Sequence, residues 1–202
     1  MCWRVVNLSF SEGICLPPKL QSIDLRSRGI RTTLPVMEWG LQGLTGLSRL
    51  TIGGCDDIVN TLMKESLLPI SLVDLSITKM KAFDVSGLRH LSSLDHLAFE
   101  YCEELESLPE NCLPSSLKSL EFWCCSRLES LPENCLPSSL KSLEFLNCEK
   151  LESLPEDNLP DSLETLCINE CPLLEERYKR KEHWSKIAHI PVIRINNQVT
   201  IW

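Results

Sequence analysis

The stretch ESLPENCLPSSLKSLEF occurs twice without a change, at residues 106–122 and at residues 129–145. Aligning the rest of the chain on it gives repeats that start at Leu94, Leu117, Leu140 and Leu163, each 23 residues after the last. A fixed period of this length is typical of a solenoid, in which one repeat cannot bury its own apolar side chains and therefore stacks on the next. We expect one linear core shared among the repeats.

Each repeat follows the pattern L-x-x-L-x-(L/F/I)-x-x-C-x-x-L, as in Leu117, Leu120, Phe122, Cys125 and Leu128. This is the leucine-rich-repeat consensus, with cysteine in the slot that takes Asn or Cys. Alternation along a strand sends Leu120 and Phe122 inward and the residues between them outward. The pattern predicts an α/β repeat solenoid, a leucine-rich-repeat horseshoe with a parallel β-sheet on its concave side.

The prolines predict the character of the convex side. Pro109 and Pro114 lie in one repeat, and Pro132 and Pro137 lie in the next. Proline removes a backbone donor and clashes with the preceding helical turn, so no long helix is expected in these repeats. Extended, polyproline-like segments or short 3₁₀ turns should join the strands, which makes the convex side mostly non-helical.

The chain divides into three regions of different regularity. Residues 94–171 hold the regular repeats, and residues 172–202 follow them as a non-repeating C-terminal cap. Residues 1–93 hold looser repeats, which begin near Trp3, Leu20, Leu47 and Leu72. A solenoid needs both ends covered, and no polar element precedes Trp3. We therefore expect that the N-terminal cap is missing and that the chain is the end of something longer.

Within the cap, residues 173–187 are expected to form one polar helix with Leu174, Tyr178 and Trp184 as apolar anchors. Pro191 ends any continuation of that helix. Beyond it, apolar residues alternate on either side of Asn196-Asn197. This alternation predicts short edge strands at the end of the sheet.

Composition excludes several classes of protein. The 202 residues carry a net charge of −8 and are 43% hydrophobic, which suits a soluble chain with a continuous core. An acidic chain has little positive charge with which to neutralise phosphates, so we expect no nucleic-acid partner. No secretory signal and no apolar run long enough for a membrane span are visible, which favours an intracellular location.

The cysteines are expected to be structural. There are 11 of them, and Cys102, Cys125, Cys148 and Cys171 recur at the repeat period, so they should stack in a buried ladder with one thiol per coil. Neither the cysteines nor the histidines show the spacing of a metal site, and no nucleophile motif is present. We expect no catalytic residue, no metal, no cofactor and no small-molecule substrate.

The outward strand positions are the candidate protein-binding face. The pattern places Glu100, Glu121 and Glu144 in one acidic column, with Tyr101, Trp123 and Leu146 near it. Such a face suits a partner that presents Arg or Lys around an apolar side chain. Alternatively, the glutamates are simply solvated copies of one repeat, and Trp123 packs on Leu146. The candidate binding residues are His96, Glu100, Tyr101, Glu121, Trp123, Glu144, Leu146 and Asn169.

Two segments at the end of the chain carry a family resemblance. SLETLCINECPLLEER at 162–177 and WSKIAHIPVIRI at 184–195, together with the cysteine-bearing repeats, resemble the C-terminal end of plant intracellular NB-LRR disease-resistance proteins of the coiled-coil class. The order of Cys171, Trp184, His189 and Pro191 is its most specific part.

The resemblance implies a role in plant defence. It implies a cytoplasmic or nucleocytoplasmic immune receptor, non-enzymatic in this region, whose repeats sense a pathogen effector or a guarded host protein. It also implies that the repeats hold a nucleotide-binding domain of the same protein inactive. The chain departs from the family because it lacks a coiled coil and a G-x-x-x-x-G-K-[ST] phosphate loop. Nucleotide binding is therefore not expected of this chain.

Other functions fit the repeats less closely. The short proline-containing repeats also resemble the substrate-binding arrays of bacterial effector ubiquitin ligases, but those usually carry Asn where this chain has Cys. A stand-alone scaffold is a further alternative. An extracellular plant receptor would require a signal peptide and many glycosylation sites, whereas Asn7-Leu8-Ser9 is the one matching sequon.

Overall fold

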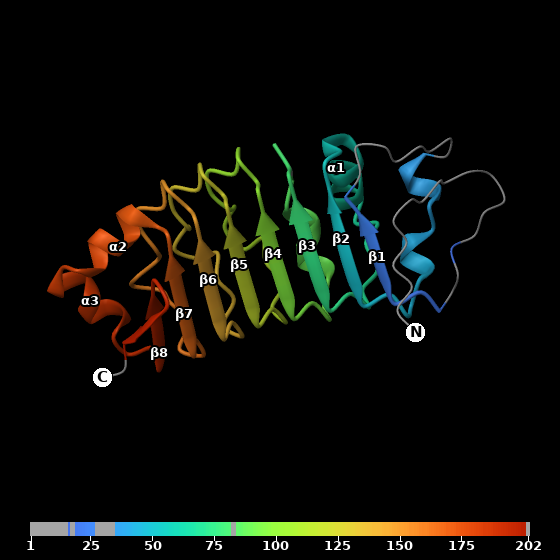
Figure 1. Cartoon of the computed structure of the whole chain (residues 1–202). Helices are drawn as coiled ribbons and strands as arrows, with labels where there is room; N and C mark the ends of the chain where they lie inside the picture. The colour runs from blue at the N-terminus through green and yellow to red at the C-terminus, as the bar shows by residue number, and fades with distance from the viewer. Residues whose placement is uncertain (1–15, 17–18, 27–34, 82–83, 201–202) are drawn as a thin grey trace.

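One continuous sheet forms the frame of the molecule (Figure 1). The computed structural model describes residues 16, 19–26, 35–81 and 84–200, so the degraded repeat expected at Trp3 lies outside the described residues. Neighbouring strands pair in chain order, parallel from β1 to β8 and antiparallel between β8 and β9. The strands are β1 (Ser22–Leu25), β2 (Arg49–Gly53), β3 (Asp74–Thr78), β4 (His96–Glu100), β5 (Ser119–Trp123), β6 (Ser142–Leu146), β7 (Thr165–Asn169), β8 (Val192–Ile195) and β9 (Gln198–Thr200).

The strands contribute two apolar ladders to the core, which run from strand to strand. Leu120 pairs with Leu143 and Phe122 with Phe145, and all four side chains are fully buried. The rings of Phe99, Phe122 and Phe145 stack with centroids 5.3 and 5.4 Å apart. Because strand residues alternate between the two faces, the same register leaves the residues between these ladders on the opposite face.

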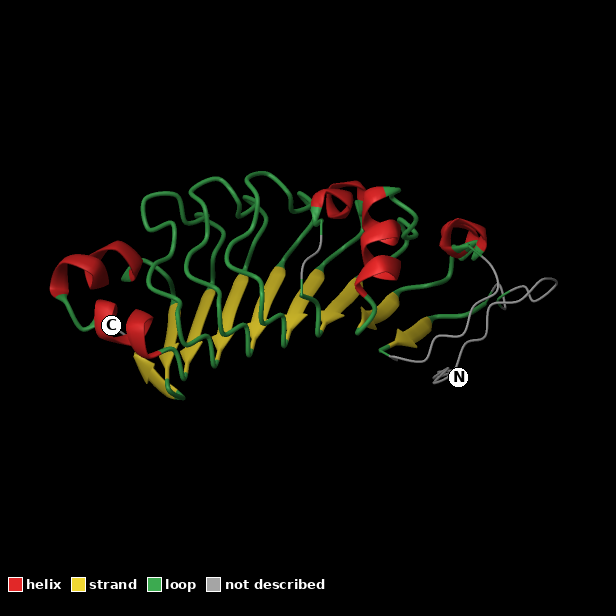
Figure 2. Ribbon diagram, turned by 90° about the horizontal axis from the view of Figure 1, so that it is seen from above, coloured by secondary structure: helices red, strands yellow, loops and turns green. Residues whose placement is uncertain are grey.

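The connections lie on the other side of the sheet, as Figure 2 shows. From β4 to α2 the connections between the strands contain only turns and extended segments and no helix, as the prolines predict. The fold prediction is confirmed: an α/β solenoid with a parallel concave sheet, a mostly non-helical convex side and a C-terminal cap. The described helices are η1 (Val36–Glu38), η2 (Leu41–Gly43), α1 (Asp56–Lys64), η3 (Ser86–His90), α2 (Pro172–Tyr178) and α3 (Lys181–Ile187).

A left-handed residue follows the strand in successive coils. Tyr101 and Cys124 have φ angles of 54° and 55°, and Lys79, Asn147 and Glu170 occupy the same position with similar values. The N–H of Tyr101 donates to the carbonyl of Trp123 in the next coil, and that of Cys124 donates to Leu146, both at 2.8 Å. Left-handed backbone costs a non-glycine residue roughly 1–2 kcal/mol. These hydrogen bonds between coils offset that cost.

The thiols of the cysteine ladder lie inside this corner. Cys102, Cys125, Cys148 and Cys171 have no exposed surface. Sγ of Cys125 donates to the carbonyl of Phe99 at 3.5 Å, and Cys102 and Cys148 make the corresponding bond to the preceding coil at 3.6 Å. The adjoining Cys102 thiol and burial both raise the pKa of Cys125. The thiol is thus a small buried donor that joins one coil to the one before it.

A serine ladder, which the sequence analysis missed, lies just before the strands. Each of these serines immediately precedes the first leucine of its repeat, and its hydroxyl donates to the corresponding leucine carbonyl of the preceding coil. The distances are 2.6–2.8 Å. The recurring Ser-Leu pair was the available signal in the sequence. The four residues are Ser71, Ser116, Ser139 and Ser162.

The cap contains two helices where the sequence analysis expected one over 173–187. The chain is extended at Arg180, with ψ at 128°, and this separates α2 from α3. Tyr178 and Ile187 are both buried. In one straight helix these positions, nine residues apart, would face about 180° away from each other. The break is what allows both helices to pack on the core.

The two strands of the cap were both expected at the edge of the sheet, but β8 lies inside it. β8 pairs with β7 in parallel, with Ile193 beside Leu166 and Ile195 beside Ile168. Ile193 therefore continues the leucine ladder and is 2% exposed. Of these strands, only β9 is terminal among the described residues. β8 therefore behaves as the strand of one further coil.

Candidate recognition surface

The outward side chains form three rows across the concave face. A first row, a central row and a rim row correspond to the first, third and fifth residues of the strands. Most members are half-buried, which is typical of side chains that stand on an open sheet. The first row runs Asp74, His96, Ser119, Ser142 and Thr165; the central row runs Ser76, Ala98, Glu121, Glu144, Cys167 and Arg194; the rim row runs Thr78, Glu100, Trp123, Leu146 and Asn169.

The register corrects the predicted acidic column. Glu121 and Glu144 are direct neighbours in the central row, but Glu100 pairs with Trp123 in the rim row. The residue of β4 that stands beside Glu121 is Ala98. Glu100 follows the buried Phe99 in its strand, whereas Glu121 precedes the buried Phe122. The two glutamates therefore occupy different positions of the repeat.

His96 links three coils through its imidazole. It donates through Nδ1 to Oδ1 of Asp74 at 3.2 Å and through Nε2 to Oε1 of Glu121 at 2.9 Å. The hydrogen bonds to Asp74 and then to Glu121 raise the pKa of His96 to about 10. The ring is therefore a cation at neutral pH. It compensates the carboxylate of Glu121 within the protein.

Glu144 has different surroundings from its neighbour. No hydrogen bond or ion pair reaches its carboxylate from the part of the chain that the structure describes. Burial raises the pKa of Glu144, and the negative charge of Glu121 raises it further. Arg194, two strands away in the same row, acts in the opposite direction. Glu144 thus carries an only partly compensated charge on the concave face.

The rim row presents the apolar part of the face. Trp123 and Leu146 are register partners, and both are half-buried. Tyr101 follows β4 at the left-handed corner, is 48% exposed and has Nζ of Lys79 6.0 Å from its ring centroid. The indole N–H of Trp123 is shielded and has no acceptor among the described residues. Trp123 therefore lies beside Leu146 and remains partly exposed on the concave face.

Asn169, at the end of the rim row, is hydrogen-bonded to the cap. Its Oδ1 accepts a hydrogen bond from the N–H of Asn197 at 2.9 Å, which holds the turn between β8 and β9. Asn196 in the same turn accepts from the N–H of Glu170 at 2.9 Å and donates to Glu175 at 2.7 Å. Asn169 therefore marks the boundary of the face that a partner can reach.

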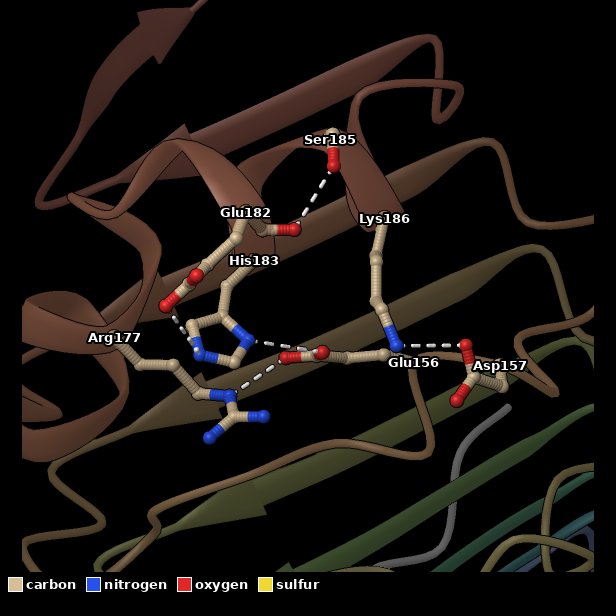
Figure 3. A network of polar contacts seen from close by, with 7 residues as sticks. All are labelled: Glu156, Asp157, Arg177, Glu182, His183, Ser185 and Lys186. Atoms are coloured by element: carbon tan, nitrogen blue, oxygen red, sulfur yellow. Dashed lines mark hydrogen bonds and ion pairs between the residues drawn. The ribbon is translucent and has the colours of Figure 1, made fainter.

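A buried ionic network holds the cap on the last regular coil, and the sequence analysis did not find it (Figure 3). Oε1 of Glu156 lies 2.6 Å from Nε of Arg177, and Oε2 lies 3.2 Å from Nδ1 of His183. Burial opposes ionisation, but the hydrogen bonds from Arg177 and His183 outweigh it and lower the pKa of Glu156. The two partners lie 21 and 27 residues after Glu156, so no local pattern in the sequence indicated the network.

The described residues contain no cluster of potential metal ligands. No group of three or more His, Cys, Asp or Glu side chains within residues 16, 19–26, 35–81 and 84–200 could hold a metal ion. Burial raises the pKa of Cys112 to about 11 and that of Cys135 to about 12, which keeps these convex thiols protonated at neutral pH. No helix in the described part of the chain is long and apolar enough to cross a membrane.

Comparison with known proteins supports the repeat architecture. The FNIP repeat family matches residues 128–171, which include β6 and β7. The matched residues lie within the regular repeats of the solenoid. Curated protein sequences give no match.

Two solved leucine-rich-repeat structures show a likeness to the chain. One is a novel circular leucine-rich-repeat protein, CroV588, with 24% identity over 77% of this chain and 25% of that one, at a TM-score of 0.44. The other is TLR13 in complex with the RNA ssRNA13, with 18% identity over 76% of this chain and 26% of that one, at a TM-score of 0.43. The chain spans about a quarter of the length of each. Leucine-rich-repeat solenoids generally present an extended concave surface for binding.

Proposed function

We propose that this leucine-rich-repeat protein is a non-enzymatic protein-recognition module that binds through the concave surface of β4 to β7. The main support is that Trp123 and Leu146 lie side by side and half-buried on the open face. The carboxylates of Glu121 and Glu144 stand in the neighbouring row. A partly exposed tryptophan next to incompletely compensated charge has the character of an interface centre. The partner is a protein, and the module uses no cofactor.

The finer proposal is that the module is the sensor region of a plant intracellular immune receptor. Its support is the resemblance of the final coil and the cap, from Cys171 through Trp184 and His189 to Pro191. In this role the concave face would contact a pathogen effector or a guarded host protein, and a nucleotide-binding domain of the same receptor would contact the solenoid. The location would be cytoplasmic or nucleocytoplasmic.

A pair of arginine substitutions tests the recognition surface. Ser142→Arg places a bulky cation in the first row of the concave face, whereas Glu152→Arg places one on the exposed return leg of the same coil. With a partner selected from displayed plant and effector proteins, we expect Ser142→Arg to abolish binding and Glu152→Arg to preserve it. Loss of binding in the Glu152→Arg variant alone would place the interface on the convex side and reject this proposal.

The genomic sequence upstream of the codon for Met1 tests the finer proposal. An in-frame nucleotide-binding domain with a phosphate loop would support the receptor sensor. A downstream catalytic domain in the same reading frame would instead favour the substrate-binding array of a ubiquitin-ligase system. A promoter directly upstream, with no further domain on either side, would favour a stand-alone scaffold.

A further inference from the structure

The concave face contains two chemically identical carboxylates with unequal compensation. Glu121 accepts a hydrogen bond from His96 at 2.9 Å, and that imidazole is cationic at neutral pH. Glu144 stands beside it on the next strand and receives no such partner from the described residues. A new cation would therefore gain more at Glu144 than at Glu121, because Glu121 is already paired.

Apart from Glu121, the side chains nearest to Glu144 in the sheet are short or apolar. In its own strand Ser142 precedes it and Leu146 follows it two residues later, and Cys167 stands beside it on β7. None of these three side chains carries a charge when Cys167 is a thiol, and burial raises the pKa of that thiol. Such surroundings screen a carboxylate less than water does and strengthen its attraction to a cation.

The apolar side of the site lies one step further along the same strands. Leu146 and Trp123 are two residues beyond Glu144 and Glu121, about 7 Å along the strand direction. In an extended partner segment, side chains at positions i and i+2 point to the same side and are separated by the same distance. One extended segment that follows the strand direction can therefore reach both the carboxylate and the apolar pair.

We propose that the concave face binds an extended protein segment that carries Arg or Lys two positions from a large apolar residue, with the cation at Glu144 and the apolar side chain on Trp123 and Leu146. This inference rests on the proposed function, because it names the partner chemistry of that same surface. The choice of a basic partner segment rests on charge complementarity. The carboxylate of Glu144 and that of Glu100 in the rim row favour a basic segment and oppose a polyphosphate such as RNA, whereas Asp74 and Glu121 already share the cation of His96.

Selection of random peptides displayed against the full chain tests the inference. Selected peptides are then titrated into the chain, with the indole N–H resonance of Trp123 as the readout of contact with the concave face. We expect Arg or Lys to be enriched two positions from Leu, Ile, Phe or Trp. We also expect Glu144→Gln to weaken binding roughly tenfold, as the loss of one charge-assisted contact does, and Glu152→Gln to leave it unchanged.

Three outcomes are distinguishable once thermal melting has shown that Glu144→Gln folds. Enrichment of the basic motif with loss of affinity in Glu144→Gln supports the inference. Peptides that shift the Trp123 resonance but lack basic residues, or bind Glu144→Gln equally well, overturn the inference and leave the recognition surface intact. Peptides that bind without perturbing Trp123 overturn the recognition surface as well.

Discussion

Glu121 and Glu144 are copies of one another in neighbouring repeats, yet their carboxylates have different surroundings. The difference comes from the preceding coil, where His96 stands within reach of Glu121 but not of Glu144. Two repeats of identical sequence can therefore differ in the hydrogen bonds and charges around the same residue, because their neighbouring strands differ. The first copy pairs with a preceding strand of different sequence, and the second pairs with its own duplicate.

This asymmetry predicts unequal effects on stability. Glu121→Gln removes the carboxylate that pairs with His96, and we expect the free energy of unfolding to fall by about 1 kcal/mol. Glu144→Gln removes a charge that Glu121 repels, so we expect no loss. Urea titrations of the two variants measure the difference. Equal destabilisation would mean that the hydrogen bond between His96 and Glu121 contributes nothing.

His96 makes stability dependent on pH in a definite direction. Its pKa in the folded chain is about 10, against an ordinary value of 6.5, because Asp74 and then Glu121 accept hydrogen bonds from the ring. A raised pKa stabilises the fold fully below the ordinary value, and this contribution is lost as pH rises through the folded value. The stability difference between the wild type and His96→Gln should therefore shrink from pH 6.5 towards pH 10. A difference that grows over this range would show that the imidazole is not held as a cation.

At the scale of the strand, the 23-residue period was sufficient to predict which residues pair. Leu120 and Leu143 are 23 residues apart in sequence and are register partners in the sheet. This worked because each regular coil contributes one strand, so that sequence period and strand spacing coincide. The same period puts Glu100 beside Trp123, 23 residues later, and not in the row of Glu121 and Glu144 where it was predicted.

Truncation of a ladder leucine tests this register directly. Leu143 has no exposed surface, so Leu143→Ala should lower the free energy of unfolding by roughly 2–5 kcal/mol, through lost burial and the cavity that remains. Its neighbour Ser142 faces outward, and Ser142→Ala should change stability by less than about 0.5 kcal/mol. Thermal melting compares the two variants. Similar melting temperatures would contradict the assignment of the inward face.

The cap could be predicted in kind but not in detail. Leu174, Tyr178 and Trp184 were sufficient to indicate a helical segment that packs on the core. The break at Arg180 carries no local signal, because no glycine or proline lies there. It follows from the need to bury Ile187 as well as Tyr178. The network around Glu156 was missed for a similar reason, since its partners lie 21 and 27 residues later in the chain.

Glu156 should contribute more to the stability of the fold than the equivalent glutamates in earlier repeats. Glu110 occupies the same slot and is exposed, whereas the side chain of Glu156 is 5% exposed and bonded to Arg177 and His183. We expect Glu156→Gln to cost about 2 kcal/mol, since hydrogen bonds to charged groups contribute on that order, and Glu110→Gln to cost nearly nothing. Hydrogen exchange at α2 and α3 measures the effect. Unchanged exchange in Glu156→Gln would show that apolar packing alone holds the cap.

At the scale of the whole molecule, the cap covers an apolar end of the solenoid. Ile193 and Ile195 cover Leu166 and Ile168 on one side, and Leu174, Tyr178 and Ile187 are buried among the helices. Removing residues 172–202 would expose this surface, so the shortened chain should self-associate. Removing residues 198–202 leaves β8 in place and serves as the control. A monomeric chain after the larger deletion, measured by light scattering, would show that the end of the solenoid needs no cover.

The most direct test of the central claim, that a partner binds on the concave face, is hydroxyl-radical labelling of side chains in the free chain and in its complex. Tyr101 is 48% exposed at the rim of that face, while Met37 in η1 and Leu173 in α2 are 63% and 45% exposed away from it. We expect a bound partner to protect Tyr101 and Trp123 and to leave Met37 and Leu173 labelled as before. Protection of Met37 or Leu173 with Tyr101 and Trp123 unchanged would contradict this claim.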